Sequence, residues 1–444
     1  MGTGRIICYH SEGVASNQRA WMRIMRLLSI RTRKPRSPVM DPANLALAEF
    51  KANPFPYYAM LRAESPVHAR TAMAEKAWLI TCYDDVALVL KDERFAKNPA
   101  NAKTPEQAAN QPWFRKLKFF KAMRRTMLAS DPPDHTRLRG LVTMAFTPRL
   151  IEQMRERIQR LTDELLDRVQ ARGGMDLIHD FALPLPTTII AEMLGVPAED
   201  RHKFHRWSNA MIAISSNWGI IKTIPNFLGL KRYLSRVVQE RRANPRDDLV
   251  SALVQAEEAG ERLSEDELLA MIVLLLVAGH ETTVNLIGNG VLALLEHPDQ
   301  LEKLRKEPAL MKSALEEMLR YDSPVSMATE RYAREDVVIQ GVTIPRGELV
   351  FAVIASANRD ERQFADPDKL DITREPNKHL SFGLGNHFCL GASLARLEGQ
   401  IAIGTLLRRA PGLRLGVPPD ALRWRAGSLL RGLVSLPVEF DRRD

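Results

Sequence analysis

The stretch HLSFGLGNHFCLGASLARLEG, residues 379–399, contains one of only three cysteines in a chain of 444 residues. Glycines and two phenylalanines surround this cysteine, Cys389, and an amphipathic helical pattern follows it. Glycines let a backbone bend tightly and approach a flat group closely. A bend here directs backbone N–H groups at the sulfur, and the N-terminal end of the next helix adds positive potential. We therefore interpret Cys389 as a thiolate placed to ligate a metal; a buried, unreactive cysteine is the alternative.

The overall composition favours one large globular domain in a reducing compartment. The three cysteines form no CxxC pair and cannot build a disulfide framework, which favours a cytoplasmic location. Hydrophobic residues make up 45% and charged residues 26%, an ordinary globular balance. The length alone permits two or three domains, but no repeat or low-complexity linker follows residue 40. The sequence therefore predicts a single domain over residues 40–444.

Most of the net charge of +9 lies in the first 39 residues, where eight Arg and Lys face one acid, Glu12. The remainder carries only +2 and shows no basic recognition motif, so we expect no nucleic-acid partner. Residues 1–39 are predicted to be a disordered basic extension, or sequence upstream of a start at Met40. A membrane-surface or targeting peptide is the alternative. No apolar run reaches the ~20 residues of a membrane span, so no transmembrane segment is expected.

Helical periodicity dominates the chain, and strand signals are few and short. Strands are predicted at 77–83, within 331–355 and near 413–440. These patterns predict a mainly α fold with small β-sheets at one side. Predicted helices span 135–146, 148–172, 185–195, 199–215, 229–242, 246–259, 264–296, 298–322 and 391–409.

The predicted helix over 264–296 is unusual because polar residues interrupt an apolar run. Ser264 and Glu267 form a capping-box pattern at its start. Residues 268–278 are apolar on every face, which predicts burial on all sides. The run then gives way to GHETT, residues 279–283, although a glycine and an acid are both unfavourable inside a buried helix. We infer that this helix has a chemical role at its centre.

Four motifs together resemble those of the cytochrome P450 (P-450) family. The pattern Phe382-x-x-Gly385-x-His387-x-Cys389-x-Gly391 resembles its haem-thiolate loop, and AGHETT (278–283) is similar to its oxygen-activation segment. EMLR (317–320) and DITR (371–374) resemble the family's internal ion-pair motifs. The resemblance covers about residues 41–440 and is closest to soluble bacterial monooxygenases of polyketide and other secondary metabolism.

The resemblance implies haem b (heme b, iron protoporphyrin IX) as the cofactor, with Cys389 as the metal ligand. Solvated surface residues are the alternative for the basic positions, and an ordinary surface ion pair is the alternative for Glu317 with Arg320. Position 387 is arginine in many family members; histidine also occurs there and can still donate a hydrogen bond, as a neutral donor at pH 7. The implied cofactor-binding residues are His135, Arg139, Ala278, Arg331, Phe382, His387, Cys389 and Gly391, and the implied structural pairing joins Glu317, Arg320 and Arg374.

The implied catalytic residues are Cys389, Thr282 and Glu281. Cleavage of dioxygen requires two protons, and the resemblance makes Thr282 a hydrogen-bond donor to dioxygen and Glu281 a source of protons through water. The alternative for Thr282 is a hydrogen bond back to the carbonyl of Ala278.

The expected activity is insertion of one oxygen atom from dioxygen into a medium-sized lipophilic substrate, by hydroxylation or epoxidation. The sequence contains no iron–sulfur, flavin or nicotinamide motif, so a ferredoxin and a ferredoxin reductase are the expected electron donors to a monomeric enzyme. Arg137, Lys378 and Arg396 are candidates for attracting an acidic partner. A peroxide-driven enzyme and a catalytically silent haem carrier are the alternatives.

The resemblance also places five apolar segments around the substrate: 108–128, 207–228, the helix before Thr282, 324–328 and 427–431. Their apolar side chains predict a lipophile and exclude sugars and nucleotides, whose polar groups would lose water without gaining partners. The predicted lining comprises Trp113, Phe114, Phe119, Phe120, Met211, Ile212, Trp218, Leu274, Val277, Ala278, Val325, Met327, Leu429 and Leu430.

Overall fold

The structure, a computed structural model, describes residues 45–72, 75–109, 125–200, 203, 207, 217–246, 248–258 and 263–442. The chain divides into two units, Met1–Pro42 and Ala43–Asp444, and all described residues belong to the second. The predicted basic extension and its boundary at residue 40 lie outside the described residues.

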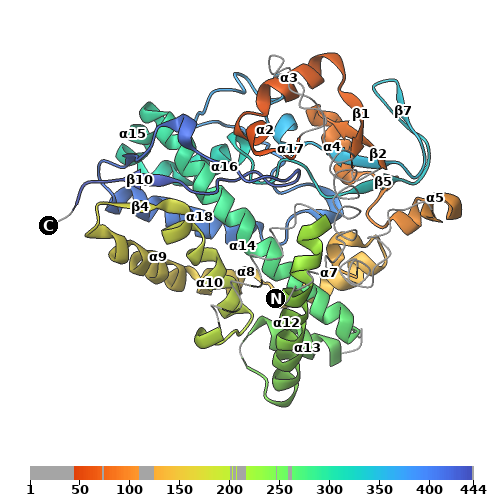
Figure 1. Ribbon diagram of the computed structural model, residues 1–444, viewed down its shortest axis with the longest axis horizontal. Coiled ribbons are helices and arrows are strands. Elements are labelled where there is room, and N and C mark those ends of the chain that lie inside the picture. Colours follow the sequence, from red (N-terminus) through yellow and green to blue (C-terminus); the bar gives the residue numbers. More distant parts are fainter. Residues whose placement is uncertain are drawn as a thin grey trace, which may run out of the picture. The chain divides into compact units, whose positions relative to one another are not determined.

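Helices form most of the second unit, as the periodicity predicts (Figure 1). The predicted helix 148–172 is two helices that meet at Met154, and the predicted helix 298–322 is divided by a 3-10 turn that begins at Pro308, since proline lacks the N–H that a continuous helix needs. Most of the predicted helix 199–215 lies outside the described residues. The helices are α2 (Ala48–Ala52), α3 (Phe55–Glu64), α4 (Tyr83–Lys91), α5 (Pro105–Ala109), α7 (Asp134–Ala145), α8 (Pro148–Gln153), α9 (Arg155–Gln170), α10 (Pro184–Met193), α12 (Asn217–Ala243), α13 (Leu249–Glu258), α14 (Glu265–Glu296), α15 (Pro298–Lys306), α16 (Met311–Tyr321), α17 (Ile354–Ala357) and α18 (Ala392–Arg409).

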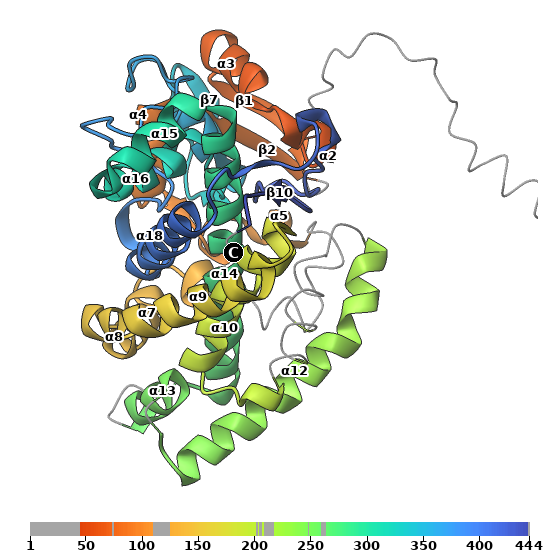
Figure 2. The same ribbon diagram turned by 90° about the vertical axis from the view of Figure 1, so that its left-hand side faces the viewer.

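The strands are short and form three small sheets, which confirms the mainly α prediction. The largest has the order β1-β2-β8-β5-β3 and lies with α2, α3 and α4 at one side of the helical part (Figures 1 and 2). Its pairs are antiparallel except β2 with β8, which run parallel. The other sheets have the orders β4-β10-β9 and β6-β7. The strands are β1 (Val67–Ala72), β2 (Glu75–Ile80), β3 (Phe95–Ala96), β4 (Gly174–Asp176), β5 (Arg331–Ala333), β6 (Val337–Ile339), β7 (Val342–Ile344), β8 (Leu349–Ala352), β9 (Arg414–Leu415) and β10 (Pro437–Glu439).

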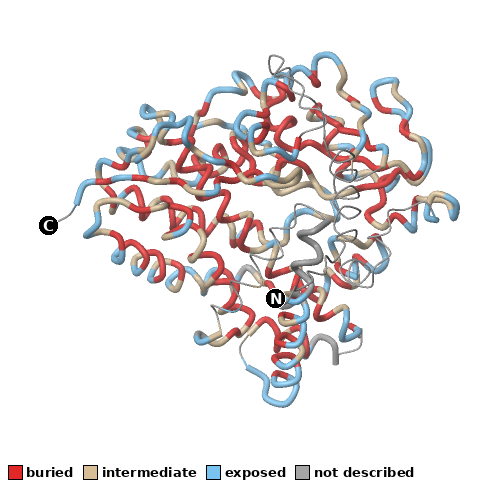
Figure 3. The backbone as a smooth tube through the Cα atoms, in the orientation of Figure 1, coloured by how far each residue is buried: buried red, intermediate tan, exposed pale blue. Residues whose placement is uncertain are grey.

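Helix α14 passes through the middle of the helical core (Figure 1). The capping box is present: Ser264 and Glu267 exchange side-chain and backbone hydrogen bonds. The polar segment 279–283 does not break the helix: α14 is continuous from Glu265 to Glu296, and buried apolar residues precede and follow this segment. Among the described residues α14 is the one helix long and apolar enough to cross a membrane, but 67% of its most apolar stretch is buried inside the protein (Figure 3). It is therefore a core helix.

Close packing brings α14 against α18, the helix that follows Cys389. Gly399 on α18 permits this approach, since a Cβ atom there would lie 3.3 Å from Leu286 of α14. The same Cβ atom would lie 2.8 Å from Leu315 of α16. The centre of α14 and the loop that carries Cys389 are thereby fixed near each other.

Candidate functional site

A cavity of about 300 Å³ lies between α14 and the 381–395 segment, within the size range of small-molecule and cofactor sites. Ala278, Gly279 and Thr282 of α14 line one wall, and Phe382, Cys389 and Gly391 line the opposite one. One edge carries basic side chains, and the rest of the lining is largely apolar. Segments far apart in the sequence thus meet around one space.

Backbone turns at two glycines shape the loop before Cys389. Gly383 and Gly385 both have a φ of 69°, in the region that favours glycine. A Cβ atom on Gly385 would also lie 3.1 Å from the carbonyl oxygen of Leu90. The Cys389 backbone N–H donates to the Phe382 carbonyl at 2.8 Å, which closes the loop and turns the thiol toward the cavity.

Opposing effects act on the Cys389 thiol in this loop. Burial raises the pKa of the Cys389 thiol, and the backbone N–H of Gly391 and the guanidinium groups of Arg139 and Arg396 only partly oppose this effect. Desolvation disfavours the charged form of a thiol. A bound metal cation removes this penalty, because a coordinating thiol is deprotonated.

The basic edge of the cavity brings together His135, Arg139, Arg331 and His387, the four basic residues among the predicted cofactor-binding positions. The rings of His135 and His387 lie 4.2 Å apart, centroid to centroid. Arg139 donates to the Asn386 carbonyl at 3.1 Å, and Arg331 donates to the Leu90 carbonyl at 3.2 Å. Burial lowers the pKa of Arg331 to about 10 and that of His387 to about 2, the latter also because cationic groups surround it.

Sequence reasoning missed a fifth basic residue at this edge, Lys97. Its ammonium group donates to the carbonyl oxygens of Thr329, at 3.1 Å, and Glu330, at 2.8 Å. Burial lowers its pKa far below the ordinary value of a lysine. No local pattern identifies Lys97, since its hydrogen-bond partners come from the segment just before β5, more than 230 residues later.

These residues fit a haem group. Among the described residues, the buried atoms His135 Nε2 and Arg331 Nε have no hydrogen-bond partner, and both belong to cavity-lining side chains. Two carboxylates at this edge would supply the missing acceptors and offset the basic charge. A flat apolar ring suits the remaining lining, and Cys389 supplies sulfur on one wall.

The two predicted catalytic residues of α14 point in different directions. Thr282 lines the cavity, and its hydroxyl donates to the Ala278 carbonyl at 2.9 Å, which is the alternative raised by the sequence. Glu281 is buried and does not line the cavity; its carboxylate forms a salt bridge with Arg425. Thr282 therefore lies on the cavity wall, while Glu281, the expected source of protons through water, lies outside the lining and is paired with Arg425.

A second buried acid, Glu398 of α18, lies near the same region of α14 and was not predicted. It is almost fully buried, forms a hydrogen bond with the Thr283 side chain, and has no partner for Oε2 among the described residues. Burial raises the pKa of this carboxyl to about 8. Its position in an otherwise ordinary amphipathic helix gave no sequence signal.

Glu317, Arg320 and Arg374 meet in one buried cluster. Glu317 accepts two hydrogen bonds from Arg320, both at 2.8 Å, and two from Arg374, both at 3.2 Å. The side chains of Glu317 and Arg320 are fully buried. The alternative of an ordinary surface ion pair between Glu317 and Arg320 is therefore wrong.

The predicted substrate-lining residues separate into three groups. Leu274, Ala278 and Val325 line the cavity. Four others do not: Val277 packs on the helical core, Met327 and Leu429 belong to the core around the large sheet, and Leu430 bridges to Val325. Their positions came from the resemblance, and packing directs these four side chains elsewhere. The remaining positions have no described side chain: Trp113, Phe114, Phe119, Phe120, Met211, Ile212 and Trp218.

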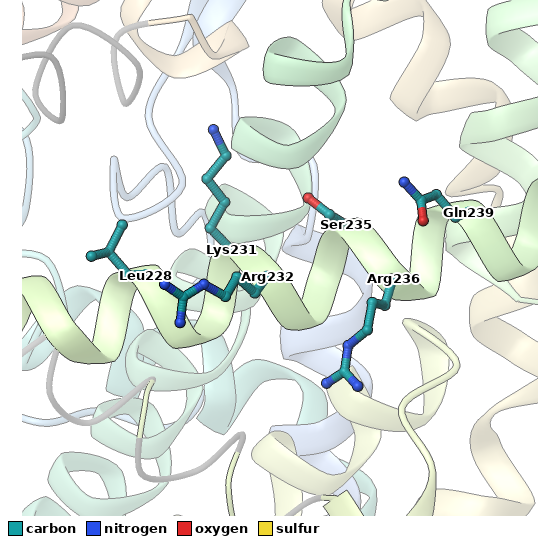
Figure 4. A pocket seen from close by; sticks show the side chains of 6 residues that line it. All are labelled: Leu228, Lys231, Arg232, Ser235, Arg236 and Gln239. Atoms are coloured by element: carbon teal, nitrogen blue, oxygen red, sulfur yellow. The ribbon is translucent and has the colours of Figure 1, made fainter.

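Two of the three candidate partner-binding cations are already paired. Arg396 forms two hydrogen bonds of 2.7 Å with Glu316, and Arg137 forms one of 2.7 Å with Glu267. Lys378 is exposed. A separate hollow follows the exposed face of α12 and contains none of the predicted site residues (Figure 4); it is lined by Leu228, Lys231, Arg232, Ser235, Arg236 and Gln239.

Comparisons with known proteins agree with this geometry. The family model described as Cytochrome P450 matches residues 65–411. The chain is 46% identical over 398 residues to the polyketide biosynthesis cytochrome P450 PksS of Bacillus subtilis, covering 89% of this chain and 97% of the relative. It is 45% identical over 409 residues to the cytochrome P450 monooxygenase PikC of Streptomyces venezuelae, covering 91% and 95%. The solved structure of P450BioI in complex with an acyl carrier protein ligated with hexadec-9Z-enoic acid has a TM-score of 0.80 at 42% identity, covering 88% of this chain and all of that one.

Proposed function

Because the chain belongs to the cytochrome P450 family, we propose that the cavity between α14 and Cys389 is the active site of a haem-thiolate monooxygenase. Enzymes of this family use haem b and insert one oxygen atom from dioxygen into a lipophilic substrate, with electrons from redox partners. The observation that carries the assignment is the position of Cys389, which opens into a cavity whose other wall is the polar centre of α14.

The proposed haem-binding residues act at two places. Cys389 supplies the sulfur ligand, and Phe382 and Gly391 line the cavity beside it. Haem, when bound, supplies the activation of dioxygen, which thiolate ligation promotes. His135, Arg139, Arg331 and His387 bind the propionates, because they form the basic edge and include buried donors without acceptors.

Thr282 and Glu281 have the proposed proton-transfer roles. The Thr282 hydroxyl lies on the cavity wall and can turn from the Ala278 carbonyl toward an acceptor in the cavity. Glu281 lies one residue before it, in contact with the partly exposed Arg425. We propose that protons enter along this pair and reach Thr282 through water.

The Glu317 cluster is proposed to fix the segment that leads to the Cys389 loop. Glu317 also accepts hydrogen bonds from the backbone N–H of Asp371, at 2.9 Å, and from Asn377, at 3.0 Å. It thereby links α16 to residues 371–377, which lie shortly before the stretch 379–399 that contains Cys389. Its role is structural support of the haem site.

The proposed substrate is a medium-sized lipophile such as a macrolide, polyketide, terpenoid or fatty acid, oxidised at an unactivated carbon. The apolar lining contributed by Leu274, Ala278 and Val325 supports this class. Such compounds are expected to shift the Soret band of the ferric protein with micromolar affinity, while sugars and nucleosides leave it unchanged. A response to a polar ligand, with none to any lipophile, would contradict the assignment.

We further propose a ferredoxin and a ferredoxin reductase as the electron donors to a cytoplasmic, monomeric enzyme. With Arg137 and Arg396 paired internally, exposed Lys378 is the remaining candidate of the three for contact with an acidic donor. We also propose that residues 1–39 are not part of the catalytic domain.

Carbon monoxide difference spectroscopy tests the central assignment. Reduced wild-type protein should show the strongly red-shifted Soret band of a thiolate-ligated carbonyl, and Cys389→Ala should lose it. Cys82→Ala is the matched control, since Cys82 is a buried free cysteine that does not line the cavity. A Cys389→Ala protein that keeps the band would overturn the assignment.

A further inference from the structure

Lys97 occupies its place because of strand pairing in the large sheet. β3 ends at Ala96, which pairs with Tyr332 of antiparallel β5, so the next residue lies beside Arg331. Lys97 is only 5% exposed, and the little surface it keeps borders the cavity. Three acceptors hold its ammonium group: the carbonyl oxygens of Thr329 and Glu330, and the Thr329 hydroxyl.

All three acceptors are neutral, and no carboxylate of the described chain lies within ion-pair distance of the Lys97 ammonium group. The nearest acids have other partners. Asp131 accepts from the backbone N–H groups of Lys97 and Asn98 and from the Asn101 side chain. Glu330 accepts from the Tyr332 hydroxyl.

The basic edge therefore carries more fixed positive charge than the described chain neutralises. Lys97, Arg139 and Arg331 can each carry a positive charge, and burial of an ammonium group without a counter-ion is unfavourable. A structural lysine would be replaceable by an apolar residue at a gain in stability. Asp131 is already paired with Arg334 at 3.6 Å, so an anion in the cavity reduces the imbalance, and two propionates would offset most of the charge of Lys97, Arg139 and Arg331.

We infer that Lys97 is a propionate-binding residue of this protein. Its ammonium group supplies a cationic donor at the edge where His387 offers an imidazole instead of a guanidinium. The inference rests on the proposed haem site. A lysine ammonium has three rotatable donors, so it can exchange one carbonyl acceptor for a carboxylate with little rearrangement. Burial and the neighbouring Arg331 lower the pKa of Lys97, and a propionate would oppose both effects.

The test is haem retention by the Lys97→Gln holoprotein, followed as transfer of haem to excess apomyoglobin. Loss of a charge-assisted hydrogen bond should accelerate the transfer roughly 10- to 100-fold. The reduction potential of the haem should become more negative, because the variant removes a positive charge that disfavours the oxidised, more cationic centre. Lys97→Arg should retain both properties.

Lys103→Gln is the matched control, because Lys103 is a neighbouring lysine that pairs with Glu75 at 2.8 Å and does not line the cavity. It should transfer haem at the wild-type rate. The double variant Lys97→Gln/His387→Arg should recover haem retention, since it returns a fixed cation to the same edge. If Lys97→Gln fails to load haem at all, recovery of loading in the double variant supports the inference, and its failure overturns it.

An unchanged transfer rate and potential in Lys97→Gln would overturn the inference, as would equal losses in Lys97→Gln and Lys97→Arg. A wild-type protein without the thiolate-type carbon monoxide band would instead contradict the proposed function. The two failures are therefore distinguishable.

Discussion

Glu281 in the middle of α14 forms a salt bridge with Arg425, although 144 residues separate them in the sequence. The Glu281 side chain is 3% exposed and that of Arg425 is 30% exposed. Arg425 also donates to the Leu433 carbonyl at 3.1 Å, which fixes the guanidinium to the C-terminal segment. The pair thus joins the core helix α14 to a partly solvated group.

Replacement of Arg425 by methionine should destabilise the holoprotein. It leaves the buried Glu281 carboxylate without a counter-charge, which costs about 3–5 kcal/mol in a fully buried pair. Partial exposure of Arg425 reduces the expected loss to about 1–3 kcal/mol. Thermal denaturation should therefore show a melting temperature lower by a few degrees, which Glu281→Gln in the same chain largely restores. The exposed Arg423→Met is the control; equal melting temperatures for both variants would show that the pair contributes nothing.

Replacement of Thr282 by alanine should separate electron consumption from product formation. The hydroxyl on the cavity wall is lost, but the helix remains, because the hydrogen bond to Ala278 only supplements the backbone ladder. Haem content should stay normal, while hydrogen peroxide rises and product per reductant falls several-fold. Thr282→Ser keeps the hydroxyl and should stay close to wild type. Unchanged coupling in Thr282→Ala would refute a role in proton transfer.

Replacement of Glu317 by glutamine should prevent stable haem incorporation. Glu317 is the single carboxylate between Arg320 and Arg374, and its loss leaves two guanidinium groups without compensation. We expect a loss of about 3–5 kcal/mol in the free energy of unfolding, together with a low ratio of haem to protein. Glu302→Gln, which removes an exposed pair with Lys306, should change neither quantity. A haem-loaded Glu317→Gln protein of normal melting temperature would contradict the structural role.

Local patterns in the sequence predicted part of this site because the relevant contacts are local. Ser264 and Glu267 meet at the start of α14, and Glu317 meets Arg320, because residues three apart share a helix face. The directions in which side chains point from a helix were harder to predict. Adjacent residues on a helix point about 100° apart, so Thr282 faces the cavity while Glu281 faces Arg425.

The long-range contacts of Lys97 and Glu398 are not indicated by any local sequence pattern. Lys97 gained its place from the pairing of β3 with β5, a register that no local pattern encodes. Glu398 shares α18 with Arg396, Arg408 and Arg409, and only packing of α18 against α14 buries it. Neither residue could therefore be assigned to the site from the sequence alone.

Removal of residues 1–39 should leave the spectrum, the activity and the solubility unchanged. The extension contributes +7 of the net charge and no predicted core residue. Reduced carbon monoxide spectra and sedimentation with anionic vesicles should be compared for the full chain and a chain that starts at Met40. Vesicle binding by the full chain alone would favour the membrane-surface alternative, and loss of haem in the shorter chain would show that the extension supports the fold.

Replacement of Glu398 by glutamine should change how stability depends on pH. Burial raises the pKa of this carboxyl from 4.5 to about 8, so the folded protein keeps a proton that the unfolded chain loses. The free energy of unfolding should therefore contain a contribution that is complete below about pH 4.5 and falls as the pH rises toward about 8. Glu398→Gln carries no titratable proton and should lack this fall. Relative to wild type it should gain on the order of 2–4 kcal/mol between pH 5 and pH 8, seen in denaturant unfolding of the holoproteins across that range. Glu302→Gln should run parallel to wild type. If the curve of Glu398→Gln does the same, Glu398 titrates as an ordinary solvated acid and burial does not hold its carboxyl protonated.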